Sequence, residues 1–174
     1  VLSVTSDTLS VTVDDGILIT TGRLADGAAT DMVTTFDASD VYNFTMPASP
    51  PLYRNLCTTS YTNATAAAVE LEISAFAVRE LTVTSGATPV SVLSLLPYQI
   101  NGGGYVGGPG TWESHETVSG TDVRWVESIT DTYTLGAGDT IDVTLTMQIS
   151  SVTTGQTGTL TTNGAMVRIT AVKR

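Results

Sequence analysis

The sequence predicts an all-β protein, and three observations carry this prediction. Apolar and polar side chains alternate strictly over residues 140–147, with the apolar ones at the odd-numbered positions. Threonine and valine, whose β-branched side chains suit a pleated strand, dominate such runs. Turns that contain glycine, such as residues 136–139, separate the runs at short intervals. The pattern is typical of antiparallel strands with one dry face and one wet face.

The first 48 residues are expected to form an extended, acidic β arm. Runs typical of strands cover residues 1–5, 9–13, 17–21, 32–36 and 41–46. Pro47, Pro50 and Pro51 follow, and proline cannot occupy a central strand because it lacks the backbone N–H. We therefore place a boundary there, with an N-terminal arm at residues 1–48 and a main domain at residues 49–174.

The main domain is expected to contain strands at regular spacing. They are residues 56–61, 67–77, 79–84, 90–96, 123–134, 140–150 and 166–172, the last of them a short closing strand. Helix competes at 67–77, where the run Ala66-Ala67-Ala68 and two glutamates favour it. The alternation of Val69, Leu71 and Ile73 with polar neighbours favours a strand. Short strands with no helical period between them predict an antiparallel sandwich or barrel.

The excess of acidic over basic residues indicates which classes of binding partner are unsuitable. The formal net charge is −10, and residues 1–50 hold seven aspartates against Arg23 alone. This acidity argues against nucleic acid, which binds through Lys and Arg, and against an anionic membrane surface. The acidic surface is either solvated or suited to a basic partner or a cation. No stretch approaches the roughly 20 apolar residues of a membrane span.

Candidate chemistry in the chain is sparse. His115 is the only histidine, and Ser114 beside it would face the other side of a strand. Cys57 is the only cysteine, so no intrachain disulfide can form, and we expect it to be buried as a small apolar residue. Zinc needs several His and Cys ligands, and no aspartate pair has the spacing of a calcium loop. We therefore expect no enzyme, no cofactor and no metal site, and interpret Asp139 as a turn carboxylate that bonds backbone amides.

Four aromatic residues flank the glycine-rich residues 101–110: Tyr98, Tyr105, Trp112 and Trp125. Such rings stack on sugars, but they equally fill a core or a subunit interface. They are thus candidate interface or glycan-facing residues. Asn43 and Asn63 begin glycosylation sequons. In the arm, Leu9, Val11 and Val13 alternate with polar residues, and these three are candidate assembly residues.

Two segments resemble a known family. The first, residues 60–73, joins Ser60-Tyr-Thr-Asn63 to alternating Val69, Leu71 and Ile73; the second is Leu135-Gly-Ala-Gly-Asp139 with its strand and the closing strand. They are similar to jelly-roll domains of phage virion proteins, of the capsid-decoration or tail-fibre type, and to tumour-necrosis-factor/complement-like jelly rolls. The resemblance covers about residues 56–172. It implies an all-β, antiparallel β-sandwich with jelly-roll topology, a homotrimer, and a structural or receptor-binding role.

The functional hypothesis is a virion structural protein. The favoured form is a capsid decoration, or cement, protein of a tailed phage that lies on the capsid surface, self-associates and binds the major capsid protein. One alternative is an extracellular, cell-surface filament or pilus whose subunits exchange the N-terminal strand. Another alternative is a glycan- or receptor-binding tip domain of a tail fibre.

Overall fold

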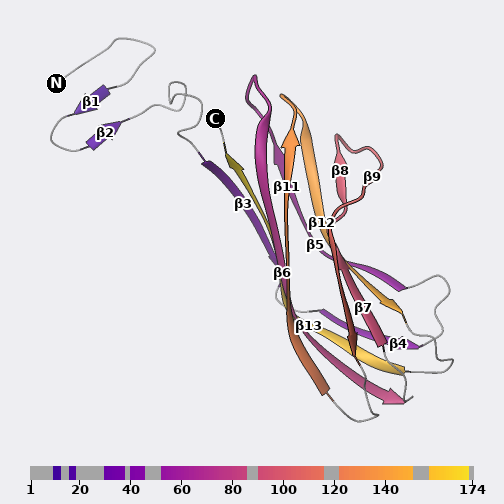
Figure 1. The fold of residues 1–174 in the computed structure, drawn as a ribbon. Coiled ribbons are helices and arrows are strands. Elements are labelled where there is room, and N and C mark those ends of the chain that lie inside the picture. Colours follow the sequence, from indigo (N-terminus) through magenta and orange to yellow (C-terminus); the bar gives the residue numbers. More distant parts are fainter. Residues whose placement is uncertain are drawn as a thin grey trace.

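Antiparallel strands make up most of the chain that the structure describes. The computed structural model describes residues 10–12, 16–18, 30–37, 40–45, 52–85, 90–115, 122–150 and 157–172 (Figure 1). Its strands are β1 (Ser10–Thr12), β2 (Gly16–Leu18), β3 (Thr30–Asp37), β4 (Asp40–Thr45), β5 (Leu52–Thr62), β6 (Val69–Ser85), β7 (Val90–Leu95), β8 (Tyr98–Ile100), β9 (Tyr105–Val106), β10 (Gly110–His115), β11 (Asp122–Leu135), β12 (Thr140–Ser150) and β13 (Thr157–Val172). Within these ranges there is no helix that could cross a membrane.

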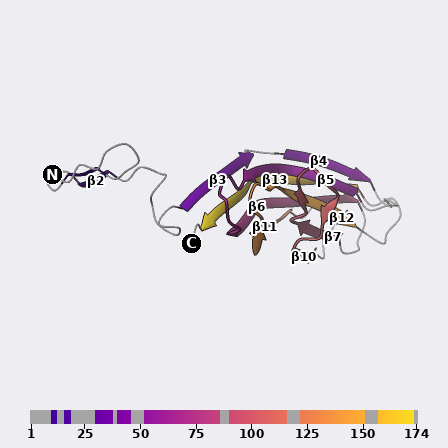
Figure 2. The same cartoon turned by 90° about the horizontal axis from the view of Figure 1, so that it is seen from above.

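The first large sheet, which we call the β6 sheet, has the order β11–β6–β13–β3, with β4 also paired to β13. β6 and β13 pair along nearly their whole length. β3 and β4 share the other side of β13, β3 along residues 165–172 and β4 along residues 157–162. They lie end to end along one border of the molecule (Figure 2). Together they occupy a single strand position.

The second large sheet, the β12 sheet, has the order β10–β7–β12–β8–β9, with β5 along the other side of β12. β7 and β8 form one interrupted strand beside β12, because Leu96 and Pro97 separate them without changing the register. Gly108 in the β9–β10 connection passes so close to this interruption that a Cβ there would lie 1.6 Å from the Leu96 carbonyl oxygen. The Leu96 N–H donates to the Pro109 carbonyl oxygen at 3.0 Å. Gly108 and Pro109, near the end of the glycine-rich segment, are therefore packed against Leu96 beside β7.

The strand order is that of a jelly roll. The strands from β3 to β13 number eleven, and counting β3 with β4, β7 with β8, and β9 with β10 leaves eight positions, four in each sheet. Two four-stranded antiparallel sheets connected in this way form a jelly-roll sandwich. The predicted fold class is confirmed. β1 and β2 pair with each other in a separate two-stranded sheet.

Part of the expected arm lies within the sandwich. β3 and β4 fall inside residues 1–48, and both pair with β13. The three prolines lie among residues 46–51, outside the described residues, between β4 in one sheet and β5 in the other. Proline clusters suit connections between sheets as well as boundaries between domains. The extent of the arm is therefore corrected, since residues 30–45 supply one strand position of the jelly roll.

Two strands are longer than the sequence suggests. β6 joins the expected strands 67–77 and 79–84 into one strand of 17 residues. β13, the expected short closing strand, has 16 residues. The first half of β13 is hard to recognise in the sequence. Its inward residues there are Gly158, Leu160 and Thr162, and only one of these is a large apolar residue. A bulge at Asn163 then shifts the register by one residue.

The two sheets enclose an aliphatic core. β6 contributes Leu71 and Ile73, and β12 contributes Ile141, Val143 and Leu145, all almost fully buried. The alternation that predicts these strands therefore gives their dry face correctly. Cys57 is buried, as expected.

An ion pair lies inside this core. Arg79 of β6 and Glu127 of β11 both point inward, and Arg79 Nε is 2.8 Å from Glu127 Oε2 with side chains 0% and 2% exposed. The remaining guanidinium nitrogens donate to Ser94 Oγ at 2.7 Å, to Thr162 Oγ1 at 3.0 Å and to Met147 Sδ at 3.3 Å. The guanidinium thus bonds side chains from four other strands, β11, β7, β13 and β12.

Glu127 is equally well partnered. Ser94 Oγ donates to Oε2, and Trp125 Nε1 donates to Oε1 at 2.9 Å. A buried charge is tolerated only when it is paired and its other hydrogen-bonding sites are used. Both partners meet this condition.

We predict that Arg79→Ala lowers the free energy of unfolding by about 3–5 kcal/mol, because Glu127 would remain buried without its cation. Urea denaturation followed by far-UV circular dichroism measures the change. The matched control replaces both charges together, as Arg79→Met with Glu127→Leu, and should lose much less. Arg124→Ala, at an exposed ion pair, should change little. A double variant as unstable as Arg79→Ala would contradict the prediction.

Candidate functional site

The four aromatic residues singled out from the sequence do not form one cluster. Tyr98 is 2% exposed and packs edge-on against Tyr133, with ring centroids 5.9 Å apart. Trp125 is half-buried against the core, where its indole bonds Glu127. Tyr105 on β9 is 59% exposed. Trp112 lies on β10 opposite Leu93, and its side chain is outside the described residues.

Tyr98 bonds a carboxylate at the end of the core. Its hydroxyl donates to Asp131 Oδ2 at 2.6 Å. Burial raises the pKa of Tyr98 well above its ordinary value of 10.0, and the hydrogen bond to Asp131 and the charge of that carboxylate raise it further. Tyr98 therefore acts as a structural residue that stays neutral.

Asp139 belongs to a network of three loops. The turn at residues 136–139 places Gly138 at φ +78°, and the Asp139 N–H donates to the Gly136 carbonyl oxygen at 3.2 Å. The Asp139 carboxylate accepts from Asn101 Nδ2 at 2.7 Å, and Asn101 Oδ1 accepts from the Thr140 N–H. The carboxylate is therefore structural, but it accepts from the side-chain amide of another loop, whereas the sequence predicts bonds to backbone amides of its own turn.

Asn63 holds this end of the sandwich together. It is fully buried, and its Nδ2 donates to the carbonyl oxygens of Ala67 at 2.8 Å, Gly136 at 2.8 Å and Leu135 at 3.3 Å. Its Oδ1 accepts from Thr65. The amide nitrogen that a glycan would need is engaged inside the fold, so the folded chain does not present this sequon. Asn43 is exposed.

The remaining candidate residues are not brought together into one site in the part of the chain that the structure describes. Among the described residues, no group of three or more His, Cys, Asp or Glu side chains could hold a metal ion. His115 ends β10, and its side chain is not among those described. Of the assembly residues, Val11 pairs with Ile17 in the β1–β2 sheet. Leu9 and Val13 lie outside the described residues.

The outer face of the β6 sheet carries exposed apolar side chains that the strand register places side by side. One row across the sheet is Phe36, Met166, Phe76 and Ser128, and the next holds Val78 beside Val126. Phe36 is 61% exposed and Val126 67% exposed. We call Phe36, Met166, Phe76, Val78 and Val126 the apolar band.

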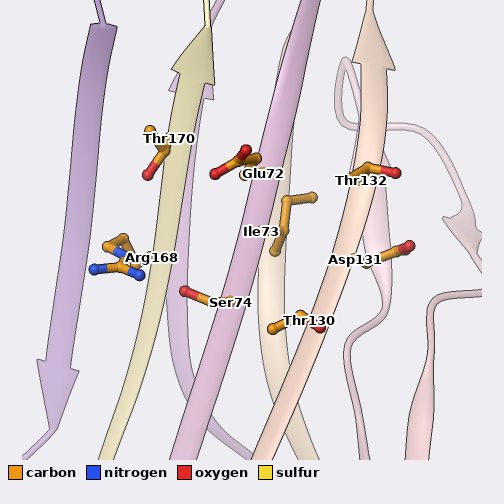
Figure 3. Close-up of a pocket in the computed structure, with 8 residues that line it drawn as sticks. All are labelled: Glu72, Ile73, Ser74, Thr130, Asp131, Thr132, Arg168 and Thr170. Atoms are coloured by element: carbon orange, nitrogen blue, oxygen red, sulfur yellow. The ribbon is translucent and has the colours of Figure 1, made fainter.

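Mainly polar rows lie on both sides of the apolar band, and they also contain two exposed apolar residues, Val41 of β4 and Met32 of β3. On one side is the row Val41, Thr161, Glu80 and Arg124. There Arg124 Nε lies 2.9 Å from Glu80 Oε2, and the hydrogen bond to Glu80 raises the pKa of Arg124 above its usual range. On the other side the sheet is hollowed by a cavity of about 430 Å³. Strands β13, β6 and β11 supply its lining, which includes Arg168, Glu72, Ser74, Thr130, Thr132 and Thr170 (Figure 3).

The sequence contains one signal for this face. Residues 75–78, Ala-Phe-Ala-Val, break the alternation of β6 with apolar residues in both phases. Strands buried on both faces show such continuous apolar runs. The partners in the same rows, Phe36 and Met166, come from distant segments, so only the register joins them into a band.

Comparison with known proteins identifies the fold. No protein-family model and no curated protein matches the chain. Solved structures of virus particles do match. A chain in the structure of the infectious bursal disease virus Gx strain has a TM-score of 0.53 at 12% identity, covering 95% of this chain and 42% of that one. A chain in the crystal structure of an infectious bursal disease virus particle has a TM-score of 0.50 at 12% identity, covering 95% and 39%.

This chain therefore spans less than half the length of the virus-particle chains that it matches. At this level of identity the likeness establishes a shared fold. The jelly-roll sandwich described above is thus a fold found in chains of icosahedral virus particles.

We predict that Tyr98→Phe makes stability less sensitive to alkaline pH. In the unfolded chain Tyr98 ionises near pH 10, whereas in the folded chain it stays protonated to higher pH. Its contribution is therefore present below about pH 10 and is lost as the pH rises, at up to about 1.4 kcal/mol per pH unit. Urea denaturation at about pH 9 and pH 11 measures the slope.

The matched control is Tyr105→Phe, which alters an exposed tyrosine and should keep the wild-type slope. Identical slopes for wild type and Tyr98→Phe would refute this role of the buried phenol.

Proposed function

We propose that the protein is a structural component of a virion. The supporting observation is that chains from solved virus particles share this fold and match the chain over 95% of its length. Its polar side chains further support the proposal, because those at Arg79, Tyr98, Asn63 and Asp139 are engaged in holding strands and loops together. The chain self-associates in this role, as subunits of particles do.

The more specific proposal is a capsid decoration, or cement, protein of a tailed phage. The protein would bind major capsid protein subunits at the capsid surface and stabilise the shell across their seams. Burial of apolar surface contributes on the order of 25 cal/mol per Å², before the cost of association. The net charge of −10 suits a basic coat surface, and the acidic residues before β3 supply an arm for that contact.

The two alternatives have less support in the structure. A donor strand needs a strand position that its acceptor leaves empty. All eight jelly-roll positions come from this chain within the residues described. A glycan site built on the four aromatic residues would lose Tyr98, which is inside the core, and Trp125, whose indole bonds Glu127. We therefore favour decoration over both alternatives.

Immunogold electron microscopy tests this function. Antibodies raised against the purified chain should label the outside of intact virions from its source, and pre-absorption with the chain should remove the label. Absence of the chain from purified virions by mass spectrometry would overturn the virion role. Labelling of disrupted particles alone would overturn the surface role.

Deletion of residues 1–14 tests the arm. The truncated chain should bind particles stripped of the native protein more weakly than the full chain, because acidic contacts to the coat are lost. Co-sedimentation over a range of salt concentrations measures this, since attraction between surface charges is screened by salt. Circular dichroism should show the same fold. Unchanged co-sedimentation would show that the arm does not contact the coat.

A further inference from the structure

We infer that the outer face of the β6 sheet is an interface between two copies of this chain, packed face to face around a two-fold axis. The apolar band crosses the middle of this face, and the rows on both sides of it are mainly polar, with exposed Met32 and Val41 at their β3 and β4 ends. An apolar centre with a polar rim is the usual anatomy of a protein interface. The role of such a pair on a particle rests on the proposed function, but the pairing itself does not.

The middle of β6 carries apolar residues on both faces of the sheet. Its inward residues Ala75 and Ala77 are 2% and 1% exposed, while the outward Phe76 and Val78 remain only partly covered. On an outer face destined for water, the outward positions would be polar, as Glu70 and Glu72 are at the start of the strand. The neighbouring strands continue the apolar surface with Phe36 and Val126, both mostly exposed.

The area of this face is sufficient for a stable pair. Outward rows run from Glu70 to Thr82 along β6 and across four strand positions. At about 3.4 Å per residue and about 4.8 Å between strands, the face measures about 40 Å by 19 Å. This gives about 770 Å², close to the roughly 800 Å² that each partner contributes to a standard interface.

The face is complementary to itself under one rotation. Consider a two-fold axis that runs parallel to the strands and lies over the gap between β6 and β13. Rotation about it places β6 of one copy over β13 of the second copy, and each row of residues faces the same row of the second copy. Met166 of one copy then faces Phe76 of the second copy, and the same contact occurs again by symmetry. Phe36 faces Ser128 of the second copy. Sheets packed in this aligned manner lie about 10 Å apart, so side chains of both faces interdigitate.

Charges on the face agree with this rotation. Arg168 of β13 is in the same row as Ser74 of β6, and Thr170 is in the same row as Glu72. In the pair, Arg168 of one copy therefore lies over Ser74 of the second copy. Glu72 of that second copy is the next outward residue along β6. Within the described residues, neither Arg168 nor Glu72 makes an ion pair or a side-chain hydrogen bond. Both line the cavity of about 430 Å³ (Figure 3). In the pair, each cavity receives an arginine from the other copy, and two symmetric Arg168–Glu72 ion pairs form.

The oligomeric mass in solution tests the interface. Sedimentation equilibrium should give twice the chain mass for the wild type, and the Phe36→Thr/Val126→Thr double variant should be a monomer at the same concentration. Threonine retains strand propensity, and both residues are exposed, so the fold should persist. Tyr105→Thr removes an equally exposed aromatic ring from the other sheet and should remain a dimer. A wild-type monomer or trimer, or a dimeric double variant, would overturn the inference.

Charge exchange tests the orientation. Arg168→Glu should weaken the dimer by about tenfold or more, since it opposes two carboxylates, and adding Glu72→Arg should restore the affinity. A purely structural effect of Arg168→Glu would not be rescued in this way.

Cysteine cross-linking tests the contact itself. A mixture of the single variants Phe36→Cys and Ser128→Cys, treated with a thiol cross-linker that spans about 10 Å, should give a chain-to-chain product that neither variant gives alone, because facing sheets lie about that far apart. No cross-link in the mixture would overturn the proposed axis. These results are independent of virion labelling, so the interface and the proposed function can fail separately.

Discussion

The buried pair of Arg79 and Glu127 is the constraint on which the sandwich depends. Removing two charges from water costs several kcal/mol per ion, and only complete partnering offsets that cost. The guanidinium meets this condition through Glu127, Ser94, Thr162 and Met147, which come from both sheets. A shift of β6 by one residue would turn Arg79 to the outer face and leave Glu127 unpaired. The network therefore selects one register and one stacking of the sheets.

The bulge in β13 follows from the same constraint. Thr162 points inward to meet Arg79, and Ala165 points inward opposite Ala77. These positions differ by an odd number, so one residue must be displaced, and Asn163 is exposed at that point. After the bulge in the sequence, Met166 points to the outer face, where it is in register with Phe76 and Phe36. An interior polar contact thus sets which side chains appear on the exterior.

The sequence predicts what depends on alternation and misses what depends on partners. The strand expected at 67–77 is found as the first part of β6, and the one expected at 140–150 matches β12, because one face of each is apolar. Arg79 is missed because a charged residue in the inward phase makes a continuous strand look like two, and its partners lie on other strands. The arm is overextended because prolines between sheets resemble a domain boundary. The aromatic residues flank one loop in sequence, yet strand phase sends Tyr98 into the core and leaves Tyr105 outside.

The two faces of the β6 sheet place different demands on one strand. The inner face must be dry and shaped around a buried cation, so small residues, Ala75 and Ala77, precede Arg79. The outer face has no such demand, and a solvated sheet would keep it polar. Phe76 and Val78 instead extend the apolar character through the sheet, in rows with Phe36 and Val126. A strand that is apolar on both faces is typical of the middle layer of three. In this chain the first two layers are its own sheets, and the third is supplied by a second copy.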